Sequence, residues 1–414
     1  MRKFIAAGAA LIALGLGAVA VHSASAAEEL PPQTLAVGDF NFAAPQTLAT
    51  GLEVPWGLAF LPDGSALVSE RSTARVLQVT ADGTVTPLFT LPGVVPDFEA
   101  GLLGLAVSPD YATDGYVYAF YQGSSDNRIV RFQLASPDQQ EPVLTGLGTG
   151  EMHNGGRIAF GPDGKLYAAV GDVAVSTNAQ SMTSNNGKIL RLNPDGSVPA
   201  DNPFAGSLIY SLGHRNVQGL AWDAQGRLFA TEFGQNTWDE INLITPGANY
   251  GWPTVEGIST NTNFTNPVIQ WKPAEASPSG AVIVGNNLFV AALRGTRLWE
   301  VPLSNGTVGT PVARLQGTFG RLRTVAVAPD GYLWVMTSMR DGKLSPGPTD
   351  DRILRFPPTD APVSQSPTAS SGPTASSEPT ASSEPTSSSE PTATSEPTAT
   401  ASAEPTASQE PAAS

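Results

Sequence analysis

The sequence predicts an all-β fold: a six-bladed β-propeller followed by a disordered C-terminal tail. A unit made of an apolar run, a Pro-Asp-Gly type turn and a second apolar run recurs six times, at roughly the 40- to 60-residue spacing of propeller blades. The 42 glycines of the 414 residues suit a chain of short strands and tight turns. The copies of the unit begin at Gly57, Leu105, Ile158, Leu220, Ala281 and Val325, and the copy at Ala281 is a looser one.

The domain boundaries follow from changes in composition. Residues 1–26 combine a basic start, an apolar run and small residues before a cleavage site, which predicts a signal peptide. Residues 27–358 hold the repeats, and the segment 34–52 before the first repeat is expected to add an outer strand to the last blade. Residues 359–414 are almost entirely Ser, Thr, Pro, Ala and Glu, which predicts a disordered tail.

Charge and cysteine content exclude several functions. The net charge of −15 argues against nucleic acid as a partner, and cysteine is absent, so the chain has no disulfide and no thioether attachment for haem. With the signal peptide, this composition predicts an extracytoplasmic protein, either secreted, periplasmic or on the cell surface. No membrane insertion is expected after cleavage, and the tail is a candidate tether to the cell surface.

Two histidines follow the predicted signal peptide, and each precedes a strand in a Gly-rich loop. His153 lies in Glu151-Met152-His153-Asn154-Gly155-Gly156, and His214 lies in Gly213-His214-Arg215-Asn216. A histidine that enters the channel there can act as a general base. Asp172 ends the strand that follows His153 in the same blade, so its carboxylate is a candidate partner for the imidazole.

Four arginines occupy loops or strand starts in the later blades: Arg215, Arg294, Arg321 and Arg323. Arg321 and Arg323 alternate along an extended segment, so both side chains project to one face. Guanidinium groups that converge on one channel end predict an anionic ligand with several carboxylates or phosphates.

A third group of polar residues offers oxygen ligands. Residues 232–240 and 246–253 concentrate carboxylates and turn carbonyls, which are the ligands that calcium prefers. The spacing is not that of an EF-hand, so ordinary polar loops remain an alternative at this point.

Several ordered motifs resemble one family. Val54-Pro55-Trp56-Gly57, Gly101-Leu102-Leu103-Gly104 and the segments 153–160, 187–191, 213–218 and 239–253 are similar to the glucose/sorbosone dehydrogenases, and among them to the soluble aldose sugar dehydrogenases. The resemblance extends from about residue 52 to 356. It implies a propeller that binds pyrroloquinoline quinone (PQQ) and Ca²⁺ at one end of its channel.

The resemblance also implies roles for individual residues. His153 matches the general base and Asp172 its orienting partner. Glu99, Arg215, Asn216, Arg294, Arg321 and Arg323 match positions around the quinone, with Glu99 standing where some relatives have Gln. The carbonyls of Gly234 and Gln235 match ligands of the calcium that touches the quinone, and Glu240 with the Tyr250 carbonyl matches a second calcium site. Met152 replaces an Asp of the glucose-specific branch, so a preference for glucose does not follow.

The function implied is oxidation of aldose sugars at the anomeric carbon to lactones, with electrons passed to an external acceptor. Residues 259–266 and 338–351 are candidate loops for sugar contacts. Two alternatives are a calcium-dependent lactonase on a similar propeller and a non-enzymatic propeller that binds carbohydrate or a surface. The lactonase would need several side-chain ligands on one central calcium and has no use for four arginines.

Overall fold

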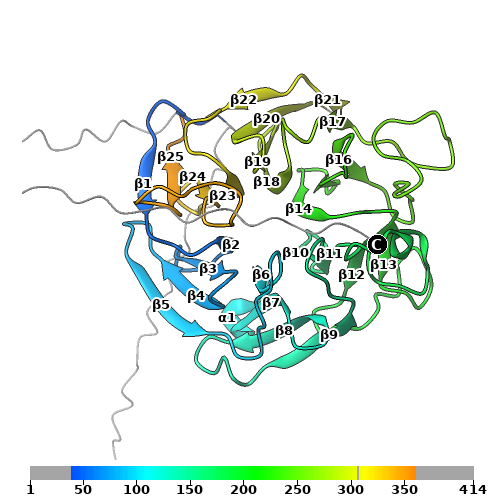
Figure 1. Ribbon diagram of the computed structural model, residues 1–414. Coiled ribbons are helices and arrows are strands. Elements are labelled where there is room, and N and C mark those ends of the chain that lie inside the picture. Colours follow the sequence, from blue (N-terminus) through cyan, green and yellow to red (C-terminus); the bar gives the residue numbers. More distant parts are fainter. Residues whose placement is uncertain (1–38, 305–306, 360–414) are drawn as a thin grey trace, which may run out of the picture. The chain divides into compact units, whose positions relative to one another are not determined.

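The computed structural model describes residues 39–304 and 307–359, and in this part of the chain it has the predicted six-bladed propeller. Figure 1 shows the six sheets arranged around a central axis, each with its first strand innermost. The predicted signal peptide, residues 1–26, and all but Thr359 of the predicted tail lie outside the described residues, so both stay predictions. No helix among the residues described is long and apolar enough to cross a membrane.

Each blade is an antiparallel sheet whose three inner strands follow the chain order from the axis outwards. The first three blades consist of β2 (Pro55–Phe60), β3 (Ala66–Glu70), β4 (Arg75–Val79) and β5 (Val85–Thr90); β6 (Leu102–Val107), β7 (Tyr116–Gln122), β8 (Asn127–Gln133) and β9 (Glu141–Leu147); and β10 (Gly155–Phe160), β11 (Leu166–Val170), β12 (Lys188–Leu192) and β13 (Ile209–Leu212).

The fourth, fifth and sixth blades consist of β14 (Val217–Trp222), β15 (Leu228–Glu232), β16 (Asp239–Ile244) and β17 (Ile269–Trp271); β18 (Pro278–Val284), β19 (Asn287–Ala292), β20 (Arg297–Ser304), β21 (Thr307–Val308) and β22 (Val312–Arg314); and β23 (Leu322–Val327), β24 (Leu333–Thr337), β25 (Ile353–Phe356) and β1 (Gln46–Ala49). Two short helical turns, α1 (Tyr111–Asp114) and η1 (Ser176–Gln180), lie between strands.

The repeated unit forms the first hairpin of each blade because its turn residues suit the bend. Asp63 Oδ1 accepts the backbone N–H of Ser65 at 2.9 Å, and Asp163 Oδ1 accepts that of Lys165 at 3.1 Å. The glycine that follows each aspartate has a positive φ, for example 86° at Gly64, a conformation that glycine adopts at little cost.

The prediction that residues 34–52 supply an outer strand to the last blade is confirmed for β1. This strand pairs with β25, so the two ends of the propeller share one sheet (Figure 1). Phe40, 5% exposed, adds an aromatic contact with Phe289, their ring centroids being 5.4 Å apart. Closure of this kind pairs a strand that would otherwise form an open edge.

The core lies between neighbouring blades, where sheets pack face to face. One cluster joins Tyr118 and Phe120 of the second blade to Leu166 and Leu190 of the third, all fully buried. Because strands alternate in direction, the turns between second and third strands and the links between blades all lie at one end of the channel. Loops that are distant in sequence therefore meet there.

Arg157 on β10 crosses the channel beneath these loops. Its Nε donates to the carbonyl of Gln218 at 2.8 Å, its Nη2 donates to Thr324 Oγ1 at 3.1 Å, and its guanidinium lies 4.2 Å from the ring centroid of Trp56. These contacts connect four blades, so Arg157 fixes the floor of the channel below the loops.

Candidate active site

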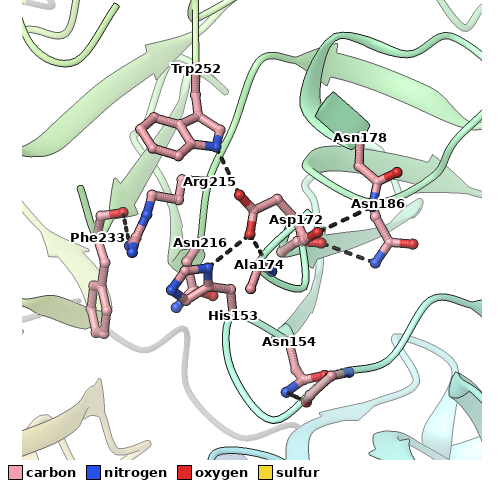
Figure 2. Close-up of polar contacts among 12 residues, drawn as sticks. His153, Asn154, Asp172, Ala174, Asn178, Asn186, Arg215, Asn216, Phe233 and Trp252 are labelled. Atoms are coloured by element: carbon pink, nitrogen blue, oxygen red, sulfur yellow. Dashed lines mark hydrogen bonds and ion pairs between the residues drawn. The ribbon is translucent and has the colours of Figure 1, made fainter. Parts of the chain in front are cut away.

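His153 and Asp172 form a hydrogen-bonded pair at the loop end of the channel. His153 Nδ1 lies 2.8 Å from Asp172 Oδ1, and the second oxygen of Asp172 accepts the indole N–H of Trp252 at 2.8 Å (Figure 2). The backbone N–H of Ala174 donates to Asp172 Oδ1 at 2.9 Å. Because the carboxylate, 1% exposed, holds Nδ1, the other imidazole nitrogen is the one that can accept a proton from a substrate.

The backbone around this pair is tightly packed. His153 has a φ of 57°, in the left-handed region that non-glycine residues rarely adopt. A side chain at Gly171 would place its Cβ 1.8 Å from the His153 carbonyl oxygen, so only glycine fits beside the base. Local strain and a close backbone approach thus hold the imidazole in one place.

Of the two histidines, His214 does not enter the channel. His214 is fully buried, with Nδ1 2.8 Å from Glu232 Oε2 and Nε2 2.8 Å from Ser211 Oγ. Its ring stacks on Tyr250 at a centroid distance of 4.9 Å. A side chain enclosed in this way supports the loop that carries Arg215 and cannot reach a substrate.

A hollow beside His153 gathers two of the four predicted arginines. Its lining includes Glu99, Arg321, Arg323 and Asp341, together with Arg71, which the sequence analysis did not identify. We call these residues the arginine hollow. Arg321 donates to Asp341 Oδ2 from Nε at 2.9 Å and from Nη2 at 2.7 Å. Glu99 turns its carboxylate to the backbone N–H of His153, at 3.3 Å.

Positively charged side chains outnumber negatively charged ones in the lining of the hollow. Burial and the charges of Arg71 and Arg321 lower the pKa of Arg323 to about 9, and burial also lowers the pKa of Arg71. Arg294, in contrast, is exposed and is not among the residues that line the hollow, although its neighbour Leu293 is. The predicted convergence therefore holds for Arg321 and Arg323 and not for Arg294.

Arg215 and Asn216 lie between the His153–Asp172 pair and the loop after β15. Arg215 Nη1 donates to the carbonyls of Phe233 at 3.2 Å and Gly234 at 2.7 Å (Figure 2). Asn216 is fully buried, and its Oδ1 accepts the backbone N–H of Gly155 at 3.1 Å. Burial lowers the pKa of Arg215, although Asp172 and Glu232 oppose the change.

Four buried donor atoms around this end of the channel have no hydrogen-bond acceptor. A buried donor without an acceptor is costly, and such atoms cluster where a ligand supplies the missing partner. Three arginines and one asparagine contribute, which fits a ligand rich in anionic oxygens. The atoms are Arg71 Nε, Arg215 Nε, Asn216 Nδ2 and Arg323 Nε.

The predicted calcium ligands lie in two places. The Gly234 carbonyl faces Arg215, as described above, and Gln235 follows it in the exposed turn between β15 and β16. Glu240 and Tyr250 are buried nearer the blade interior, where Glu240 Oε1 accepts the backbone N–H of Gly257 at 2.6 Å. Among the residues described, no group of three or more His, Cys, Asp and Glu side chains is arranged to hold a metal.

The surroundings of Glu240 nevertheless fit a cation. Burial and the nearby charge of Glu232 raise the pKa of Glu240 to about 8. Asn242 donates from Nδ2 to Glu232 at 3.2 Å and to Glu240 at 3.0 Å, while its own Oδ1 is buried without a partner. Two buried carboxylates and an unpartnered amide oxygen are the donors that a hard cation prefers.

Three residues of the hollow that were not predicted from the sequence, Arg71, Asp341 and Lys343, lie in equivalent loops. Arg71 follows β3 directly, as Asp172 follows β11, and Asp341 lies in the loop after β24. Each loop joins the second and third strands of a blade and so ends at the same end of the channel. Lys343 lines the same hollow from the loop after β24, and Trp56 lines it from β2. Trp252 contacts Asp172 from the long loop between β16 and β17.

The comparisons with known proteins agree with this geometry. Residues 52–346 match the sequence model of the family described as Glucose / Sorbosone dehydrogenase. The chain belongs to this family. It is 31% identical to an aldose sugar dehydrogenase of Escherichia coli, over 73% of this chain and 93% of that protein. It is 34% identical to quinoprotein glucose dehydrogenase B of Acinetobacter calcoaceticus, over 60% of this chain and 61% of that protein.

A solved structure is more similar. It is the PQQ-bound form of an aldose sugar dehydrogenase from Streptomyces coelicolor, with 49% identity and a TM-score of 0.73, covering 76% of this chain and 98% of that one. The predicted family and fold are therefore both confirmed.

Proposed function

We propose that this chain oxidises aldose sugars at the anomeric carbon to lactones, using PQQ and calcium. The observation that carries the proposal is the arginine hollow with its excess positive charge and unpartnered donors, next to the His153–Asp172 pair. PQQ has three carboxylates and two quinone oxygens, so it matches this donor set in charge and chemistry. The PQQ-bound state of the Streptomyces relative adds support.

The residues that would hold the cofactor follow from their positions. Arg71, Arg321 and Arg323 would bind the carboxylates of PQQ, while Arg215 and Asn216 would donate to oxygens nearer His153. The family resemblance places Arg294 and Glu99 near the cofactor. Arg294 would contact it from the rim of the hollow, and Glu99 would contact it from its position beside His153. Calcium would bind the carbonyls of Gly234 and Gln235, with a second ion at Glu240 and the Tyr250 carbonyl.

The side chains divide the chemistry among them. Bound there, PQQ supplies a two-electron acceptor for the hydride of the anomeric carbon, and calcium supplies Lewis-acid polarisation of the quinone. His153 removes the proton of the anomeric hydroxyl through Nε2, a step that contributes about 10²- to 10⁴-fold in rate. Asp172 fixes the tautomer and stabilises the resulting imidazolium, and Trp252 fixes Asp172.

The electrons would leave to an external acceptor, since the chain has no cysteine for a covalent haem. The sugar would contact residues 259–266 and 338–351, the loops beside this end of the channel. We further propose that the protein is exported, with the tail at residues 359–414 as its link to the cell surface. The calcium-dependent lactonase and the binding propeller are the competing functions, and neither uses a cluster of buried arginines whose Nε atoms lack acceptors.

The decisive test is dye reduction by the purified protein with a panel of aldoses, with and without added PQQ and calcium. His153→Ala serves as the matched inactive variant. Activity that requires both additions and disappears in the variant supports the proposal and ranks the sugars. No activity, together with no binding of PQQ in an absorbance titration, would overturn it.

A further inference from the structure

One carboxylate organises the turn that carries the predicted calcium ligands. Glu256, from the long loop between β16 and β17, accepts four successive backbone N–H groups at a single oxygen. The donors are the amides of Gln235, Asn236, Thr237 and Trp238, at 2.6, 3.0, 3.0 and 3.1 Å. Hydrogen bonds from amides to an ionised acceptor are about twice as strong as those between neutral groups.

Peptide geometry links these N–H groups to the carbonyls of the turn. In a trans peptide the C=O of one residue and the N–H of the next point in opposite directions. The N–H groups of Gln235 and Asn236 point to Glu256, so the carbonyls of Gly234 and Gln235 point away from it. The Gly234 carbonyl accordingly meets a cationic group on the far side, Arg215 Nη1 at 2.7 Å.

The fit of the turn around the carboxylate is close. A Cβ on Gly234 would lie 1.7 Å from the Trp238 carbonyl oxygen and 2.6 Å from Glu256 Oε1, so only glycine allows the turn to close on Glu256.

We infer that Glu256 is a positioning residue that aims the carbonyls of Gly234 and Gln235 at a divalent cation. The inference rests on the proposed function, because the cation is the calcium proposed to bind with PQQ. Glu256 does not contact that cation through its own carboxylate. It fixes the peptide planes of the turn, so that two carbonyl oxygens need no reorganisation when the ion binds.

The test is calcium binding to the PQQ-saturated, chelator-treated full chain, measured by isothermal titration calorimetry. Glu256→Ala should weaken the ion bound at this turn by about 10- to 100-fold, the usual effect of removing a group that orients metal ligands. Glu256→Gln, which keeps an acceptor oxygen without the charge, should weaken it less. Glu275→Ala is the matched control, because this exposed glutamate accepts a single backbone N–H, that of Lys272 at 3.1 Å.

Hydrogen exchange of the amides 235–238 provides the second measurement. Loss of the carboxylate should make these amides exchange faster in the Glu256 variants, while the melting temperature of the protein stays at the wild-type value. Wild-type calcium affinity in Glu256→Ala would overturn the inference and leave the proposed function intact. Absence of calcium binding in the wild-type protein would instead overturn the calcium part of the proposed function and this inference with it.

Discussion

Replacing Arg323 with methionine should stabilise the cofactor-free protein and weaken its binding of PQQ. Arg323 is 4% exposed, and the lowering of its pKa to about 9 corresponds to roughly 5 kcal/mol against the charged form. Its neighbours keep partners in the variant, because Gln218 Oε1 still accepts Ser279 Oγ at 2.9 Å and Asp341 still accepts Arg321. With the lost contacts deducted, we expect a gain of about 1–3 kcal/mol.

The effect on PQQ should have the opposite sign. Loss of one buried guanidinium–carboxylate contact costs about 2–5 kcal/mol, which is about 30- to 4,000-fold in the dissociation constant. Urea denaturation of the cofactor-free protein and absorbance titration with PQQ measure the two effects separately. Arg227→Met is the control, because Arg227 pairs with Asp223 at 2.6 Å in the turn between β14 and β15, at the other end of the channel. A destabilised Arg323→Met protein, or one with wild-type affinity for PQQ, would refute the reasoning.

Three further substitutions test how neighbouring residues hold His153 and stabilise the surrounding loops. Asp172→Asn should lower kcat by about 10²- to 10⁴-fold with little change in KM, and near-wild-type turnover would contradict the role of the pair. Trp252→Phe removes the N–H that Asp172 accepts at 2.8 Å and should lower kcat by about 5- to 30-fold. Steady-state kinetics measures the effect of each of these two substitutions. An unchanged kcat in Trp252→Phe would show that Asp172 does not need the indole N–H. Lys188→Met removes the ammonium that donates to three backbone carbonyls at 2.6, 3.1 and 3.0 Å, and should cost about 2–4 kcal/mol of unfolding free energy at pH 7 in urea melts. Burial lowers the pKa of Lys188 to about 8, so the folded protein releases this proton while the unfolded chain holds it up to about 10.5. The unfolding free energy of the wild-type protein relative to the variant should therefore rise between these two pH values. A difference in unfolding free energy that does not change with pH would contradict the lowered pKa of Lys188.

The fold could be predicted from the sequence because its signals are local. In the turns at Asp63 and Asp163, for example, the aspartate accepts the N–H two residues on and the next residue is a glycine with positive φ. Six such hairpins leave few ways to pack other than a ring, and a ring needs a closing strand, which β1 supplies. The His153–Asp172 pair could also be predicted from the sequence, because both residues belong to one blade.

The rest of the site depends on contacts between blades that no local pattern encodes. Arg323 meets Gln218 across 105 positions of sequence, and Trp252 meets Asp172 across 80. Arg71 and Arg294 occupy equivalent loops of different blades, yet only Arg71 is buried in the hollow. Which arginines converge is decided by loop conformation and burial, so residue type and spacing alone did not separate the exposed Arg294 from the buried arginines and overlooked Arg71.

The same physics connects the two proposed ligands. At one end of the channel the chain buries guanidinium groups whose pKa is lowered by burial. Nearer the interior of the fourth blade it buries a carboxylate pair in which the pKa of Glu240 is raised to about 8. Each group is destabilising for the protein alone, because a buried charge without a counter-charge costs several kcal/mol. An anion at the arginines and a cation at Glu232 and Glu240 would each relieve its own penalty, so ligand binding would return stability that the free chain lacks. The large core between the blades is what allows the chain to fold while holding both.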